Sequence, residues 1–82
     1  MIIRPLRPDL QKYLSKHNLE KKFSKQKRLF ENNPAHPGLN TELLEPKRLK
    51  IYSFRLDRKY RAIFIYTGQE TVEIIDINPH YA

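Results

Sequence analysis

The sequence predicts an α+β fold in which two N-terminal helices pack on one antiparallel sheet, in the order β-α-α-β-β-β. Apolar residues recur at helical spacing over the first 32 positions and at strand spacing after position 51. A segment dense in turn residues, 32–38, separates the two halves. Because helices and strands are segregated along the chain, the α+β class is favoured. We expect residues 1–82 to form a single domain.

The first strand and the first helix follow from a few local signals. Residues 1–4 are expected to form a short strand that ends at Pro5, since proline cannot donate a hydrogen bond to a sheet. A helix is expected to begin near Arg7, because Pro8 suits a first turn and Asp9 lies near the positive end of the helix dipole. One amphipathic stripe then follows at intervals of three and four: Leu10, Tyr13, Leu14 and His17.

A second helix is expected to run from Asn18, which would cap it, to about Asn32. Its apolar residues lie mainly on one side: Leu19, Phe23, Leu29 and Phe30. Lysine and arginine occupy most positions between them. Both helices are therefore amphipathic and need a sheet to cover their apolar sides.

Three strands are predicted in the C-terminal half, at residues 51–56, 60–66 and 71–77. The first two alternate in side-chain type, and the third is rich in β-branched residues. The connecting residues, 57–59 and 67–70, are few enough for hairpins. The three strands should therefore form an antiparallel meander.

The chain is strongly basic, with 16 Lys and Arg against nine Asp and Glu and a net charge of +7. Such a domain is predisposed to bind polyanions, because neutralising phosphates releases condensed counterions; a solvated lysine surface explains the composition equally well. Cysteine is absent, which excludes disulfides and fits a reducing compartment. No apolar stretch approaches the ~20 residues of a membrane span. We expect a soluble, cytoplasmic protein without a membrane partner.

Fourteen of the 16 basic residues fall into two groups of seven. The first lies on the predicted helices, where solubility is the commoner role. The second follows residue 46: Lys47, Arg48, Lys50, Arg55, Arg58, Lys59 and Arg61. Tyr52, Phe54 and Tyr60 are interleaved with it. Cations hold phosphates while aromatic rings stack on unpaired bases, a combination typical of single-stranded RNA recognition.

Arg61 and Arg55 each share a predicted strand face with apolar neighbours. A guanidinium in such a place needs an anionic partner, because burying an unpaired charge is costly. A salt bridge to Glu73 or Asp76 on the neighbouring strand would supply one. A bound phosphate would do so equally well, since the planar guanidinium binds phosphate through two parallel hydrogen bonds. Alternation alone leaves both interpretations open.

The three histidines, His17, His36 and His80, lack the spacing of metal ligands, so we expect no metal site and no cofactor. Only two glycines are present, which excludes a Gly-rich phosphate loop. His80 follows the last predicted strand and precedes Tyr81. Its imidazole is a candidate general acid, since it titrates near neutral pH.

Three stretches of the sequence resemble RelE/ParE-type toxins. They are residues 33–39 (NPAHPGL), 49–55 (LKIYSFR) and 58–64 (RKYRAIF). The family pattern has an NP–hPgL turn, a yS–R strand and a yRaify strand in this order, and the resemblance covers about residues 19–81. The closing Asn78-Pro79-His80-Tyr81 is further similar to the RNA-cleaving, YoeB-like branch, whose chains finish in a His-Tyr pair. The resemblance implies the toxin of a type II toxin–antitoxin system.

The resemblance also implies catalytic roles. Enzymatic members of the family cut messenger RNA on the ribosome without a metal, by attack of a 2′-hydroxyl on the neighbouring phosphate. Arg61 matches the phosphate-stabilising arginine, while His80 and Tyr81 match the C-terminal acid and its aromatic partner. Glu42 lies at the matching distance before Arg61 for the base, with Glu45 as the alternative. Either glutamate could instead be a solvated loop residue.

Substrate contacts are expected from the second basic group and its first aromatic residue: Lys47, Arg48, Lys50, Tyr52, Arg55 and Arg58. The implied partners are messenger RNA, the ribosome and an acidic antitoxin whose disordered segment folds against the basic groove. The family also contains ParE-like proteins that inhibit DNA gyrase by binding, and inactive members. Both remain alternative functions, and the oligomeric state is left open.

Overall fold

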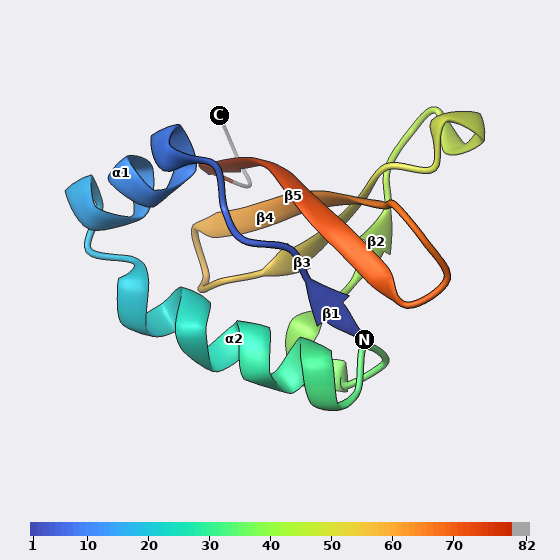
Figure 1. Cartoon of the computed structure of the whole chain (residues 1–82), viewed down its shortest axis with the longest axis horizontal. Helices are drawn as coiled ribbons and strands as arrows, with labels where there is room; N and C mark the ends of the chain where they lie inside the picture. Colours follow the sequence, from blue (N-terminus) through green and yellow to red (C-terminus); the bar gives the residue numbers. More distant parts are fainter. Residues whose placement is uncertain (80–82) are drawn as a thin grey trace.

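The strands form one five-stranded sheet, and the two helices pack on one of its faces (Figure 1). The computed structural model describes residues 1–79. Its elements are, in order, β1 (Ile2–Ile3), α1 (Pro8–Lys16), α2 (Glu20–Asn32), β2 (Glu42–Leu43), β3 (Tyr52–Arg55), β4 (Tyr60–Tyr66) and β5 (Thr71–Pro79). Two 3-10 helices, η1 (Pro37–Leu39) and η2 (Lys47–Leu49), lie in the connections on either side of β2. The predicted α+β class is confirmed.

The strand order is β1-β5-β4-β3-β2. β3, β4 and β5 form the predicted antiparallel meander, and β4 has the predicted bounds. The sheet is mixed rather than wholly antiparallel, because β1 runs parallel to β5. Glu42 and Leu43 add a strand that was not predicted, since two residues are too few to show a period. Neither helix within residues 1–79 has the length and apolar character needed to cross a membrane.

Asn18 separates the two helices, which corrects its predicted role as a cap. Its φ of 55° lies in the left-handed region, which asparagine tolerates better than most residues and which often ends a helix. The residue that caps α2 is Leu19, and no side-chain hydrogen bond assists it. Asn18 therefore terminates α1 and does not start α2.

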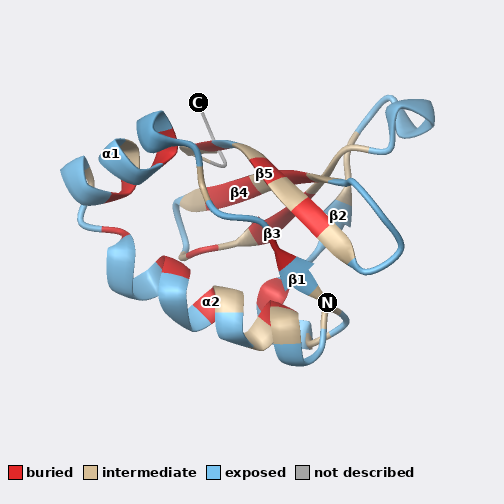
Figure 2. Ribbon diagram, viewed as in Figure 1, coloured by how far each residue is buried: buried red, intermediate tan, exposed pale blue. Residues whose placement is uncertain are grey.

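The core lies between the helices and the sheet, and three phenylalanines without exposed surface form its centre (Figure 2). Phe30 of α2 stacks on Phe54 of β3, with ring centroids 5.3 Å apart. Its ring also meets that of Phe64 of β4 edge-on, at 5.2 Å. Such pairs add stability beyond the area they bury. Because Phe54 and Phe64 face the helices, their neighbours along the strands point to the opposite face.

A bulge in β5 changes which side chains reach that opposite face. Ile63 pairs with Asp76, whereas the next residue, Phe64, pairs with Ile74, so β5 holds one extra residue. Ile74 and Ile77 are both buried, while Ile75 is half-buried and Asp76 is exposed. The bulge thus allows two consecutive side chains, Ile75 and Asp76, to lie outside the core.

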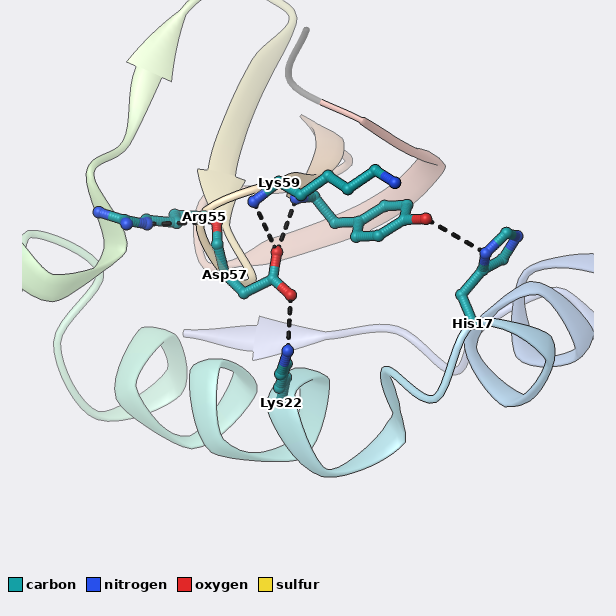
Figure 3. A network of polar contacts seen from close by, with 6 residues as sticks. His17, Lys22, Arg55, Asp57 and Lys59 are labelled. Carbon is teal, nitrogen blue, oxygen red and sulfur yellow. Dashed lines mark hydrogen bonds and ion pairs between the residues drawn. The ribbon is translucent and has the colours of Figure 1, made fainter. Parts of the chain in front are cut away.

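A polar network fastens the β3–β4 turn to both helices (Figure 3). One Asp57 oxygen accepts the backbone N–H groups of Lys59 at 2.8 Å and Tyr60 at 2.7 Å, and the other accepts Lys22 Nζ at 2.8 Å. The Tyr60 hydroxyl lies 3.2 Å from His17 Nδ1 on α1. Partial burial opposes ionisation of Asp57, but the Lys22 bond and the two backbone bonds outweigh it and hold the carboxyl pKa below its ordinary value.

Candidate functional site

A cleft of about 470 Å³ lies on the side of the sheet opposite the helices. Four strands and the ends of the β2–β3 connection line it: Glu42, Leu44, Ile51, Ser53, Arg61, Ile63, Ile75, Asp76 and Asn78. Its volume lies in the range of small-ligand pockets. The cleft therefore brings together side chains that are up to 36 positions apart in the sequence.

The strand register arranges the lining residues in transverse rows. Glu42 pairs with Ser53, Ser53 with Ile63, and Ile63 with Asp76, so this row has a carboxylate at each end. Three strand spacings, about 14 Å, separate the two terminal Cα positions. The adjoining row carries two cations and an amide: Arg55, Arg61 and Asn78.

Arg61 is buried, with 4% of its surface exposed. Its Nε donates to Ser53 Oγ at 2.8 Å, and its Nη2 donates to the Asn40 carbonyl and, at 3.4 Å, to the Ser53 carbonyl. Within residues 1–79 no carboxylate lies at salt-bridge distance from it. Of the two interpretations left open for Arg61, the internal salt bridge to Glu73 or Asp76 is therefore wrong. The guanidinium is held by neutral acceptors, because it leans toward β3 and the residue before β2.

Burial lowers the pKa of the Arg61 guanidinium from its ordinary value, while the charge of Glu42 opposes this shift and Arg55 adds to it. The ordinary pKa of arginine lies far above neutral pH, so the group stays cationic at neutral pH. A desolvated cation whose hydrogen-bond partners are neutral attracts an anion more strongly than a solvated one. Arg61 is thus suited to hold a phosphate at the cleft.

Glu42 and Glu45 differ clearly in position. Glu42 lines the cleft and acts electrostatically on Arg61. Both glutamates are exposed, but Glu45 lies beyond the end of β2 and does not line the cleft. Of the two glutamates left open by the sequence, the geometry favours Glu42, and its role as the base remains a prediction.

A solved YoeB/ParE toxin from Agrobacterium tumefaciens matches this structure with a TM-score of 0.71, over 98% of this chain and 96% of that chain. The chain has the RelE/ParE-like fold. The sequence identity in this match is 17%, so the likeness concerns the fold. An "Uncharacterized protein" of Haemophilus influenzae is 46% identical over 44 residues, which are 54% of this chain and 43% of that protein. The match thus spans less than half of that relative. No protein-family model matches the sequence.

In this RelE/ParE-like fold, three predicted substrate-binding cations lie on the connection between β2 and β3. Lys47 and Arg48 belong to η2, and Lys50 follows it in a left-handed conformation with a φ of 55°. All three are exposed, and the connection extends away from the sheet (Figures 1 and 2). Its ends, Leu44 and Ile51, line the cleft, so the cations are carried on an arm that starts at the cleft.

The other two predicted substrate-binding cations, Arg55 and Arg58, lie toward the β3–β4 turn and do not line the cleft. Arg55 neighbours Arg61 across the strands, yet its Nε donates to the Asp57 carbonyl at 3.2 Å. It lines a second cleft of about 330 Å³, together with Lys22, Lys25, Gln26, Gly38, Leu56 and Asp57. Arg58 is exposed in the β3–β4 turn. Arg55 thus connects the Arg61 row with the basic surface of α2.

The aromatic residues interleaved with the basic group do not line the cleft. Phe54 has no exposed surface, so the expectation that it could stack on a base is wrong. Tyr52 stacks on Phe64 with centroids 5.5 Å apart, and Tyr60 packs against the core beside Tyr13. The period-two pattern places Tyr52, Phe54 and Tyr60 on the helix-facing side. A substrate contact by Tyr52 remains a prediction that this cleft does not support.

Two cleft residues were not predicted as functional. Asp76 was considered only as a salt-bridge partner and Asn78 only as part of the closing motif, although Asn78 Nδ2 donates to Asp76 Oδ2 at 3.0 Å inside the cleft. The predicted acid His80 and its partner Tyr81 lie outside the described residues. Within residues 1–79, no group of three or more His, Cys, Asp or Glu side chains could hold a metal ion.

Proposed function

We propose that this chain is the toxin of a type II toxin–antitoxin system and that it cuts messenger RNA on the ribosome without a metal ion. The observation that carries the proposal is the presence of the buried Arg61 guanidinium and the Glu42 carboxylate in one cleft. The RelE/ParE-like fold supports the toxin class. The proposal treats residues 1–82 as one toxin domain that acts in the cytoplasm.

The proposed reaction is an intramolecular phosphoryl transfer. Glu42 removes the proton of a ribose 2′-hydroxyl, and the freed oxygen forms a bond to the neighbouring phosphorus. The bond from phosphorus to the 5′ oxygen breaks, and His80 gives that oxygen a proton. One product carries a 2′,3′-cyclic phosphate and the other a 5′-hydroxyl. Tyr81 is assigned as the aromatic partner of the acid, from the resemblance.

Arg61 would stabilise the charge that develops on the non-bridging phosphate oxygens. Its Nε and Nη2 are engaged by Ser53 and Asn40. Among the hydrogen bonds within residues 1–79, none uses Nη1, which leaves its two donors for a phosphate. The bonds to Ser53 and Asn40 hold the guanidinium in place before the substrate arrives, so little reorganisation is needed.

The remaining cations would hold the polymer. Lys47, Arg48 and Lys50 lie on the arm at the end of the cleft, while Arg55 and Arg58 lie on the other side of Arg61. The net charge of +7 supplies a sequence-independent attraction to RNA. The same surface suits the proposed acidic antitoxin, whose disordered segment would cover it.

The alternative function is inhibition of DNA gyrase by binding alone. The structural match carries both names, YoeB and ParE, and therefore does not separate the two activities. A binding inhibitor needs neither a base nor an acid. The cleft residue Glu42 and the C-terminal His80 thus discriminate between these functions, and an inactive basic module is the remaining possibility.

The test compares four proteins expressed from a tightly repressed promoter: wild type, Glu42→Gln, His80→Ala and Glu45→Gln. We expect wild type and Glu45→Gln to arrest growth and to create new messenger RNA ends that carry a 5′-hydroxyl. Glu42→Gln and His80→Ala should fold normally, as judged by circular dichroism, and create no such ends. Glu45→Gln is the matched control, because it makes the same chemical change outside the cleft. Arrest by all four proteins with intact messages would support gyrase inhibition, and no arrest by any would indicate an inert module.

A further inference from the structure

The cleft has a β2 side and a β5 side, and each combines aliphatic side chains with a carboxylate. On the β2 side lie Glu42, Leu44 and Ile51, and a hydrogen bond draws the Arg61 guanidinium toward Ser53. On the β5 side, Ile63 and Ile75 line the cleft beside the Asp76–Asn78 pair. Among residues 1–79, the proposed chemistry uses Glu42 and Arg61. It assigns no role to the β5 side chains that line the cleft.

The apolar part of the cleft is unsuited to a phosphate, because aliphatic side chains cannot replace the water that solvates its charge. A nucleobase fits better: its faces are apolar, and its hydrogen-bonding groups lie on its edge. Ile63 and Ile75 would contact a base face, and the exposed Asp76 carboxylate would meet the base edge. A nucleotide that places its phosphate at Arg61 would thus have a site for a neighbouring base.

Resting on the proposed ribonuclease function, we propose that Asp76 selects guanine at one position beside the cut. An ionised carboxylate only accepts hydrogen bonds. Guanine presents two adjacent donors, N1–H and the exocyclic amino group, and so bonds both carboxylate oxygens. Adenine and cytosine each present one donor beside an acceptor, and uracil presents one donor between two acceptors. Each of these three bases would turn a carbonyl or ring-nitrogen lone pair toward the carboxylate.

The surroundings of Asp76 favour a role in recognising the base over a second catalytic role. Asn78 donates to Oδ2 at 3.0 Å, which orients the carboxylate while lone pairs remain on both oxygens. The guanidinium of Arg61 leans away from Asp76, toward Ser53 and the Asn40 carbonyl. About 14 Å of sheet separates the Cα positions of Asp76 and Glu42. Asp76 is therefore placed beside the reaction and not at it.

The experiment maps message cut sites across the transcriptome for wild type, Asp76→Asn and Glu73→Gln. Glu73 lies on the same strand and does not line the cleft, so its variant removes the same charge without touching the cleft. We expect guanine to be enriched at one fixed position in wild-type and Glu73→Gln cuts. Asp76→Asn should still cut, with that enrichment reduced at least about fivefold, the lower bound for losing one bidentate base contact. Thermal unfolding of the purified proteins checks that all three fold.

The outcomes separate the two proposals. Wild-type cutting without guanine enrichment, or undiminished enrichment in Asp76→Asn, overturns the role of Asp76 and leaves the ribonuclease intact. Loss of enrichment in Glu73→Gln as well would show a general charge effect and also overturns it. Absence of wild-type cutting overturns the ribonuclease and this inference together. The wild-type map alone therefore suffices for a first decision, whatever the behaviour of the variants.

Discussion

Ser53 and Arg61 should be energetically coupled, because each supplies the other with a hydrogen-bond partner inside the protein. Ser53 has no exposed surface, and its hydroxyl accepts Arg61 Nε at 2.8 Å. Hydrogen bonds that involve a charged group contribute about 1.5–3 kcal/mol. Ser53→Ala in the wild-type background leaves this N–H without its acceptor and should lower the free energy of unfolding by about 2 kcal/mol.

The same substitution should behave differently once the arginine is gone. In the Arg61→Met background the Ser53 hydroxyl has lost its donor, so removing that hydroxyl discards an unsatisfied buried group. We expect Ser53→Ala there to be neutral or slightly stabilising. The coupling free energy from the four proteins should then be about 2 kcal/mol, within the range found for contacting residues.

Urea unfolding at pH 7, followed by circular dichroism, measures all four free energies. An 82-residue domain has a total stability of about 4–12 kcal/mol, so a change of this size is resolved. It corresponds to a shift in melting temperature of about 8–16 °C. Ser24→Ala, at an exposed position on α2, is the matched control and should change stability by less than about 0.5 kcal/mol. If the Ser53 and Arg61 substitutions add within about 0.5 kcal/mol, the reasoning is refuted.

Three further predictions concern the core, the turn and the arm. Phe30→Ala should lower the free energy of unfolding by about 3–5 kcal/mol, since the side chain is fully buried between two rings, as measured by urea unfolding. Asp57→Asn should cost about 1–2 kcal/mol at pH 7. Because the folded-state pKa of Asp57 lies below the unfolded value, its contribution is complete above about pH 4 and is lost as the pH falls through the folded pKa, so unfolding at stepped pH should show the difference closing. Replacing Lys47 and Arg48 with alanine should flatten the dependence of log K on log salt for single-stranded RNA by about 0.7 per lost phosphate contact, as measured by fluorescence anisotropy.

Each of these has an outcome that contradicts it. A loss below about 1 kcal/mol for Phe30→Ala would mean that the core closes over the missing ring. A difference for Asp57→Asn that persists at pH 2 would show that ionisation of Asp57 is not its source. An unchanged salt slope after removal of Lys47 and Arg48 would place the arm away from the RNA.

The elements with long, regular patterns could be predicted from sequence. The seven residues of β4 alternate without interruption, and its bounds were predicted correctly. Pro8 marked the start of α1 for a local reason, because its fixed φ suits a first helical turn. β2 was not predicted, since two residues show no period and their pairing depends on β3 being present. The cap at Asn18 was assigned wrongly, because asparagine favours both helix starts and left-handed helix ends.

Some residues of the candidate site could likewise be predicted from the sequence, and others could not. Arg61 and Glu42 were predicted from a resemblance carried by short motifs, and the shared cleft supports that pairing. The partners of Arg61 could not be predicted, because a serine on the next strand and a backbone carbonyl give no signal in a sequence. A salt bridge from Arg61 to Asp76 was one of two open alternatives, and it does not form because the guanidinium is bonded to Ser53 and Asn40 instead.

The sequence by itself determined the segregated helices and strands, the basic surface and the chemical kinds of side chain available for a phosphate site. These depend on local periodicity and on composition, which act over a few residues at a time. Only the tertiary structure decided that Arg61 is held by neutral partners, that Glu42 rather than Glu45 lies beside it, and that Asp76 faces the cleft. Those facts depend on strand register and on one bulge, and register is set by packing between segments that are far apart in the chain.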